Sequence, residues 1–167
     1  MMLAQLGPSQ ETDKTLICFT DGSALNNGKH NAKAGYATVW PYHEELNSSI
    51  PLKTNPTNNR AEYTAIIHAI NQADVLDPEH NKTLIIYTDS MLLVNSMTKW
   101  LPNWKRSNYM KHDGKPVLNQ DLIKTIDQLS KTRKIAYRHV RAHTNASTWE
   151  AKYNAIADNL ARQAAQN

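Results

Sequence analysis

The chain has 167 residues, 40% of them hydrophobic, and a formal net charge of +4 from 19 basic and 15 acidic side chains. This composition excludes a disordered protein, and the single cysteine, Cys18, excludes a disulfide framework. No apolar run approaches the roughly 20 residues that span a bilayer, so we expect no membrane association. The length fits one domain, which we expect over residues 14–167 after a loosely ordered segment at 1–13. We expect this protein to be a monomer without an obligate protein partner, in an intracellular setting, cytoplasmic or nuclear.

Short β-favouring runs occupy the first third of the chain. Leu16–Thr20 predicts a strand that stops at the turn signal Asp21-Gly22-Ser23. Ala34–Trp40 and Glu44–Leu52 predict the next two strands. Because the three runs follow one another closely, we expect an antiparallel meander.

Helices alternate with strands in the rest of the chain, as the change from alternating to helical hydrophobic spacing indicates. The expected elements are a helix at Asn59–Ala73, a strand at Thr83–Thr88, a helix from Met91 to about Trp100 broken by Pro102, a helix at Asp121–Leu129, a strand at Lys134–His139 and a helix at Lys152–Ala165. This order predicts an α/β fold, in which a five-stranded mixed sheet of three antiparallel strands and then parallel strands is flanked by helices.

Four acidic residues are candidates for a joint site. Asp21 and Asp89 each follow a buried-looking strand, and ligands gather at the carboxyl ends of strands in α/β sheets. Glu62 lies in the first turn of its expected helix, and Asp158 interrupts the small and apolar residues of the last helix. Taken singly, each acid also fits a turn, a cap, a helix dipole or an ion pair with a neighbouring arginine. Brought together, they would repel one another, and a divalent cation such as Mg²⁺ relieves that repulsion.

Basic residues concentrate between Thr98 and Val117, a segment that contains five of them and only one acid, Asp113. Trp100, Trp104 and Tyr109 are interleaved with them. The pattern indicates a surface for a polyanion with flat stacking groups, or alternatively a solvated helix face with its aromatic residues turned inward.

These residues resemble the type 1 ribonuclease H family over almost the whole chain, from Lys14 to Ala165. Five ordered blocks carry the resemblance: FTDGS at Phe19–Ser23, TNNRAEYTA at Thr57–Ala65, YTDS at Tyr87–Ser90, KWLPNWKR…GKPVLNQDL at Lys99–Leu122, which looks like the family's basic protrusion, and NAIADNLA at Asn154–Ala161. The resemblance implies an RNase H-like fold and a catalytic domain. It also implies an endonuclease that hydrolyses the RNA strand of RNA–DNA hybrids and leaves 5′-phosphate and 3′-hydroxyl ends.

The resemblance also implies roles for particular residues. Two Mg²⁺ ions, with Mn²⁺ as a substitute, would be bound by four acids at the scissile phosphate, and a histidine on the loop before the last helix would assist catalysis. The acids are Asp21, Glu62, Asp89 and Asp158, and the histidine is His143. The implied substrate contacts are Asn58 and Asn59 to the RNA strand, Thr57 and Asn119 to a DNA phosphate, Trp100 and Trp104 to deoxyribose, and Lys105 and Arg106 as a source of long-range attraction.

The stretch between His143 and Asp158 is longer than in many bacterial members and resembles some viral and retroelement members. Three alternatives therefore stay open: the RNase H domain of a retroelement reverse transcriptase, a non-catalytic hybrid-binding module, and another two-metal phosphodiesterase on this fold. The presence of all four acids disfavours the second. The Asn58-Asn59 pair and the tryptophan-bearing protrusion disfavour the third.

Overall fold

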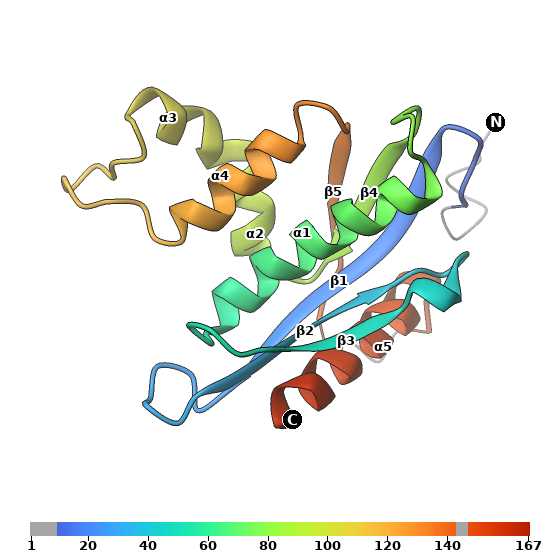
Figure 1. Ribbon diagram of the computed structural model, residues 1–167, viewed down its shortest axis with the longest axis horizontal. Coiled ribbons are helices and arrows are strands. Elements are labelled where there is room, and N and C mark those ends of the chain that lie inside the picture. The colour runs from blue at the N-terminus through green and yellow to red at the C-terminus, as the bar shows by residue number, and fades with distance from the viewer. Residues whose placement is uncertain (1–9, 143–146) are drawn as a thin grey trace.

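The computed structural model describes residues 10–142 and 147–167, and within them one mixed sheet has the strand order β3-β2-β1-β4-β5 (Figure 1). The antiparallel half consists of β1 (Thr15–Leu25), β2 (Lys33–Val39) and β3 (Ser48–Leu52). The parallel half adds β4 (Thr83–Thr88) beside β1, and then β5 (Ile135–His139). This architecture confirms the five-stranded mixed sheet that the sequence predicts.

Helices cover both faces of the sheet (Figure 1). Successive side chains of a strand point to opposite faces, so Leu16 and Cys18 of β1 pack in one core cluster while Ile17 and Phe19 pack in the other. The first cluster lies under α1 (Asn58–Leu76), α2 (Met91–Asn95) and α4 (Gln120–Leu129), and the second lies under α5 (Trp149–Gln166). None of the helices in the described part of the chain is long and apolar enough to cross a membrane.

The first strand is longer than predicted, and the expected turn at Asp21-Gly22-Ser23 is wrong. These residues stay extended because they pair with β2, with Asp21 opposite Ala37 and Gly22 opposite Tyr36. The glycine is needed for packing, since a Cβ on Gly22 would lie 2.5 Å from the backbone nitrogen of Glu62. Asp21 therefore lies inside β1, directly against the start of α1.

Two other predicted boundaries differ from the structure. The segment predicted as one strand at Glu44–Leu52 starts with a 3₁₀ turn at Glu44–Leu46, and only Ser48–Leu52 pairs with β2. The last helix starts at Trp149 rather than Lys152, so much of the long stretch before Asp158 is helical.

The helix predicted to break at Pro102 does not do so. It continues from α2 through one π turn, Ser96–Trp100, into α3 (Leu101–Arg106). Pro102 lies in the first turn of α3, where the missing N–H of proline is tolerated.

Candidate active site

The fold brings together three acids from three different elements. Asp21 lies in β1, Asp89 directly follows the parallel neighbour β4, and Glu62 lies in α1. One carboxylate oxygen from each lies within 4.8 Å of the others. Because α1 starts at Asn58, Glu62 lies in its second turn and not in the first, where the sequence placed it. The dipole explanation for this acid is correspondingly weaker.

The fourth acid, Asp158, reaches the same cluster from α5. It lies within hydrogen-bonding reach of the Asp21 carboxyl, and its charge also acts on Glu62. Asp158 forms an ion pair with Arg162 one helical turn later as well. Asp158 therefore belongs to the acidic cluster and forms the ion pair at the same time. Arg162 offsets part of the negative charge of the cluster.

Burial and mutual repulsion dominate the electrostatics of the cluster. Asp21 is 3% exposed; its burial, followed by the charges of Asp89 and Asp158, raises its pKa from 3.8 to about 8. Burial and then the charges of Asp21 and Asp89 also raise the pKa of Glu62 well above its usual value. The cluster is therefore unfavourable in its fully ionised form unless positive charge enters it.

The donor set fits a divalent cation. Asp21 Oδ1 accepts a hydrogen bond of 2.9 Å from the Gly22 N–H. Asp21 Oδ2 and Glu62 Oε1 are buried and have no hydrogen-bond partner within residues 10–142 and 147–167. Buried oxygens are rarely left unpaired, and carboxylate oxygens are the ligands that hard divalent cations take. The two orphaned oxygens and the raised pKa values mark this cluster as a divalent-metal site.

Asn154 is a site residue that the sequence reasoning missed. It lies in α5, it is 4% exposed, and its Nδ2 donates to Asp89 Oδ2 at 3.3 Å. It precedes Asp158 by four residues, so the two share a helix face. A buried amide one turn before the acid, in an alanine-rich helix, is the signal that could have identified it.

The residues predicted to contact the RNA strand and a DNA phosphate lie around the start of α1. Thr57 caps the helix by accepting a hydrogen bond from the Arg60 N–H, and Asn58 and Asn59 are exposed in its first turn. Asn119 lies beside them, because Arg60 donates to its Oδ1 at 3.3 Å and forms a two-pronged ion pair with Asp121. The sequence reasoning did not assign Arg60, which joins α1 to the start of α4.

The predicted basic protrusion consists of α3 and the loop that follows it, and it projects beside α4 (Figure 1). Trp100 and Trp104 lie together there, with ring centroids 5.8 Å apart. Lys105 pairs with Asp127 at 3.2 Å, whereas the guanidinium of Arg106 donates to Asn103 and has no acidic partner among the described residues.

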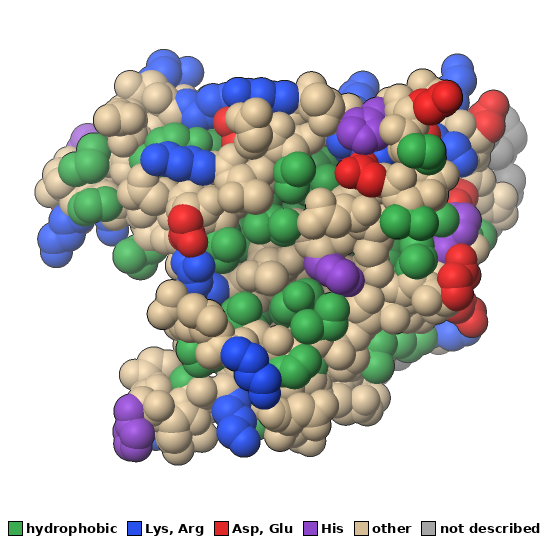
Figure 2. Space-filling view, viewed as in Figure 1, with side chains coloured by type: hydrophobic (Ala, Val, Ile, Leu, Met, Phe, Trp, Pro, Cys, Tyr) green, Lys and Arg blue, Asp and Glu red, His purple; other side chains and the backbone are tan. Residues whose placement is uncertain are grey.

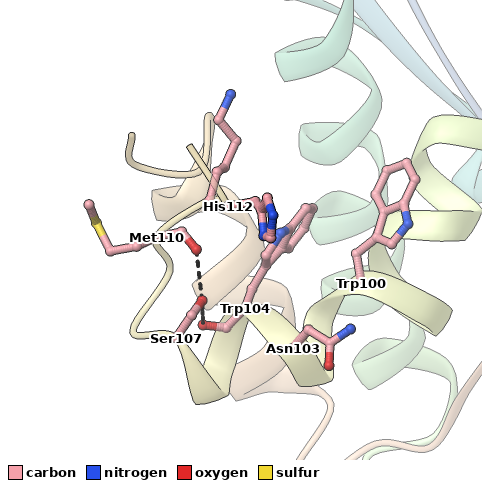
Figure 3. Close-up of a pocket in the computed structure, with 7 residues that line it drawn as sticks. Trp100, Asn103, Trp104, Ser107, Met110 and His112 are labelled. Atoms are coloured by element: carbon pink, nitrogen blue, oxygen red, sulfur yellow. Dashed lines mark hydrogen bonds between the residues drawn. The ribbon is translucent and has the colours of Figure 1, made fainter. Parts of the chain in front are cut away.

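A pocket of about 610 Å³ opens on the protrusion, and the two tryptophans form part of its lining (Figure 3). Basic side chains gather over the protrusion, and the surface is hollowed beneath it (Figure 2). The alternative interpretation, in which the aromatic residues turn inward, holds in part: Tyr109 is buried and Trp104 packs against the core, whereas Trp100 is 37% exposed. The remaining lining residues are Asn103, Ser107, Met110, Lys111 and His112.

The predicted catalytic histidine, His143, lies outside the described residues. Val140, the first residue after β5, is buried and bonds through its N–H to the Thr88 carbonyl at 2.9 Å. The chain therefore leaves β5 beside Asp89.

The chain matches known proteins along nearly its full length. The RNase H family model matches residues 13–166. Ribonuclease H of Tropheryma whipplei is 38% identical over 156 residues, which cover 93% of this chain and 88% of the relative. Ribonuclease H1 of Rattus norvegicus is 33% identical over 153 residues, which cover 92% of this chain but only 51% of the rat protein, so the chain spans about half of that relative. The solution structure of the PFV RNase H domain superimposes with a TM-score of 0.71 at 27% identity, covering 90% of this chain and 94% of that domain.

Proposed function

The chain belongs to the RNase H family, as a type 1 member, and from this premise we propose that it is an endonuclease that hydrolyses the RNA strand of RNA–DNA hybrids. The observation that carries the proposal is the cluster of Asp21, Glu62 and Asp89, in which two buried oxygens lack a hydrogen-bond partner in the described part of the chain. The names of the relatives support the activity, and the structure of a foamy viral protease–reverse transcriptase with an RNA/DNA hybrid, 23% identical, supports the fold.

We propose two Mg²⁺ ions, or Mn²⁺ in their place, as the cofactors of the cluster. A pair of divalent ions held by these acids would supply Lewis-acid activation of a water molecule and positive charge at the leaving oxygen. Asp21 lies in β1, the middle strand of the sheet, and within hydrogen-bonding reach of Asp158. We therefore assign it as the ligand shared by both ions, with Glu62, Asp89 and Asp158 as the other ligands. Asn154 holds the Asp89 carboxylate in one orientation. The products are a 5′-phosphate and a 3′-hydroxyl.

Residues at the start of α1 distinguish the two strands in this proposal. The amides of Asn58 and Asn59 both donate and accept, which suits the 2′-hydroxyl that separates RNA from DNA. They lie one turn before Glu62, so a ribose bound there is next to the acids. Thr57 and Asn119 bind a phosphate of the DNA strand. Arg60 adds positive charge between them, although Asp121 balances it.

The protrusion holds the DNA strand. Trp100 and Trp104 offer flat surfaces that pack against deoxyribose, where a 2′-hydroxyl would be in the way, and Lys105 and Arg106 attract the phosphates. A non-catalytic hybrid-binding module would have no need for the acidic cluster, whose repulsion destabilises the metal-free protein. The RNase H domain of a reverse transcriptase would use the same residues in the same roles.

A cleavage assay with three duplexes tests the proposal. Hybrid, double-stranded RNA and double-stranded DNA of one sequence, each with both strands labelled, are incubated with the protein and Mg²⁺, or with a chelator. We expect Mg²⁺-dependent cutting of the RNA strand in the hybrid alone. Equal cutting of double-stranded DNA, or an intact hybrid with both Mg²⁺ and Mn²⁺, would contradict the proposal.

A further inference from the structure

The helical stretch between Asp89 and the protrusion contains one π turn, Ser96–Trp100. The Leu101 N–H bonds to the Ser96 carbonyl, five residues earlier, where an α-helix would use the carbonyl four residues earlier. Such a turn holds one additional residue, so the helix after it is rotated by about 100° compared with an uninterrupted α-helix. π turns inside α-helices occur frequently at functional sites.

The additional residue decides where Trp100 points. In an uninterrupted α-helix, Trp100 would follow Leu93 by about two full turns and would share its direction into the core. In the structure it is Leu101 that points into the core together with Leu93, and the two leucines are 8% and 1% exposed. Trp100, in contrast, is 37% exposed. The π turn thus places Leu101 in the core and leaves the Trp100 indole at the pocket, beside Trp104 (Figure 3).

Ser96, the first residue of the π turn, is linked to α1 by a side-chain hydrogen bond. It is fully buried, and its hydroxyl donates to the Leu92 carbonyl at 2.7 Å. The same hydroxyl accepts a hydrogen bond of 2.9 Å from the hydroxyl of Tyr63, which is 3% exposed. A buried hydroxyl without a hydrogen-bond partner is costly. The two side chains therefore favour the π-turn backbone, in which both hydroxyls are hydrogen-bonded.

We propose that the Tyr63–Ser96 hydrogen bond holds the π turn and thereby turns Trp100 toward the substrate, which makes Tyr63 a positioning residue of the hybrid-binding surface. The inference rests on the proposed function. Tyr63 is the neighbour of Glu62 in α1. One turn of α1 therefore carries both an acid of the cluster and the anchor of Trp100, and it fixes the spacing between the cleavage site and the contact to the DNA strand.

Two substitutions, Tyr63→Phe and Ser96→Ala, each remove the hydrogen bond. Tyr137→Phe is a matched control, because Tyr137 packs against the same core cluster and its buried hydroxyl has no partner in the described residues. We expect the first two variants to raise the KM for the hybrid by about three- to tenfold, the worth of one hydrogen bond, with kcat unchanged. The double variant should be no worse than either single variant. A lowered kcat with unchanged KM would overturn the proposal.

A second measurement needs no substrate. Fluorescence quenching by acrylamide is compared for each variant and for the same variant carrying Trp100→Phe, and the difference reports the exposure of Trp100. We expect quenching of Trp100 to fall in Tyr63→Phe and Ser96→Ala and to stay unchanged in Tyr137→Phe. Unchanged quenching in all three would overturn the proposal. A protein that shows the expected quenching but cuts no hybrid would refute the proposed function and leave the role of the hydrogen bond in the π turn supported.

Discussion

Asp21 makes the metal-free protein sensitive to pH. Its pKa is raised to about 8 in the folded state, whereas the unfolded chain loses this proton near its usual value of 3.8. The folded state binds the proton more tightly, so this contribution to stability is complete below about pH 4 and is lost as the pH rises toward 8. We predict that the melting temperature of the metal-free protein falls across this window.

Substitution of Asp21 tests whether this residue causes the pH dependence of stability. Asp21→Asn removes the titrating group, so the variant should melt on the order of 5 °C above the wild type at pH 8 without metal. Mg²⁺ should stabilise the wild type more at pH 8 than at pH 5, because the carboxylates are ionised there. Melting temperatures of wild type and variant that run parallel from pH 4 to pH 8 would contradict the assigned cause.

Asn154 acts on the metal site through Asp89. Asn154→Ala removes the hydrogen bond of 3.3 Å to the Asp89 carboxylate and so loses one of the contacts that orient it. Loss of such a supporting contact typically costs about 10- to 100-fold in metal affinity or activity. We therefore predict that the Mg²⁺ concentration for half-maximal cleavage rises by about tenfold or more. Asn159→Ala, an exposed asparagine of the same helix, is the control and should leave the Mg²⁺ dependence unchanged.

Individual elements show where sequence patterns were sufficient. Thr83–Thr88 was predicted with its observed bounds, because a short apolar run followed by Asp89-Ser90 has no competing partner that would extend it. β1 runs past its turn signal because β2 pairs with Asp21 and Gly22, a long-range contact that no local pattern contains. The π turn was missed as well, and the hydrogen bond that we propose holds it comes from Tyr63 in another helix, which no local pattern contains.

The contact between β1 and α1 sets the position of two acids. A methyl group on Gly22 would lie 2.5 Å from the Glu62 nitrogen and 2.6 Å from the Ala61 carbonyl carbon, and backbone atoms cannot move aside cheaply. Gly22→Ala should therefore push α1 away from β1. We predict a loss of about 1–3 kcal/mol in the free energy of unfolding, together with a large loss of cleavage, since Glu62 moves away from Asp21. Denaturant unfolding and a cleavage assay measure the two effects.

Gly28 provides the control for this element. It lies in the β1–β2 loop, and a methyl group added to it would meet nothing within 4 Å, although its φ of +84° makes substitution locally strained. Gly28→Ala should cost some stability but leave cleavage per folded molecule intact. Equal losses of activity in both variants would show that the close approach of α1 is not what matters.

On the scale of the whole molecule, the candidate metal site and the basic surface lie apart. Asp21, Glu62 and Asp89 meet where β1, β4 and α1 approach one another, whereas basic side chains gather over the protrusion (Figure 2). Binding to phosphates releases counterions, so hybrid affinity should fall steeply with salt. We predict that Arg106→Gln lowers the slope of log affinity against log salt by about one, as for the loss of one phosphate contact. Lys105→Gln should lower it less, because Asp127 already offsets that charge.

Lys14→Gln is the matched control for salt dependence. Lys14 is exposed just before β1, whose start lies at the opposite end of the molecule from α3 (Figure 1). Its substitution should leave the slope unchanged. If all three variants changed the slope equally, the attraction would come from net charge and not from the protrusion.

Asp21, Asp89 and Asp158 could be identified from the sequence because each stands at a break in an apolar pattern, whereas Glu62 was identified by its place in an expected helix and by the family resemblance. The sequence could not locate Arg60 or Asn154, whose importance depends on partners 59 to 65 positions away in the chain. It also could not show that one oxygen each of Asp21 and Glu62 is buried without a partner among the residues that the structure describes, since that burial follows from how closely α1 packs on β1. The residue types could be read from the sequence, but how these residues lie relative to one another could be learned only from the structure.

Cleavage and binding by Asp21→Asn, measured on one sample, test the central claim most directly. The substitution keeps the shape of the side chain but removes the negatively charged carboxylate that we propose binds both cations. We predict that RNA-strand cleavage with Mg²⁺ falls on the order of a thousandfold or more, while hybrid affinity stays within about threefold of the wild type. Cleavage close to the wild-type rate would contradict the account.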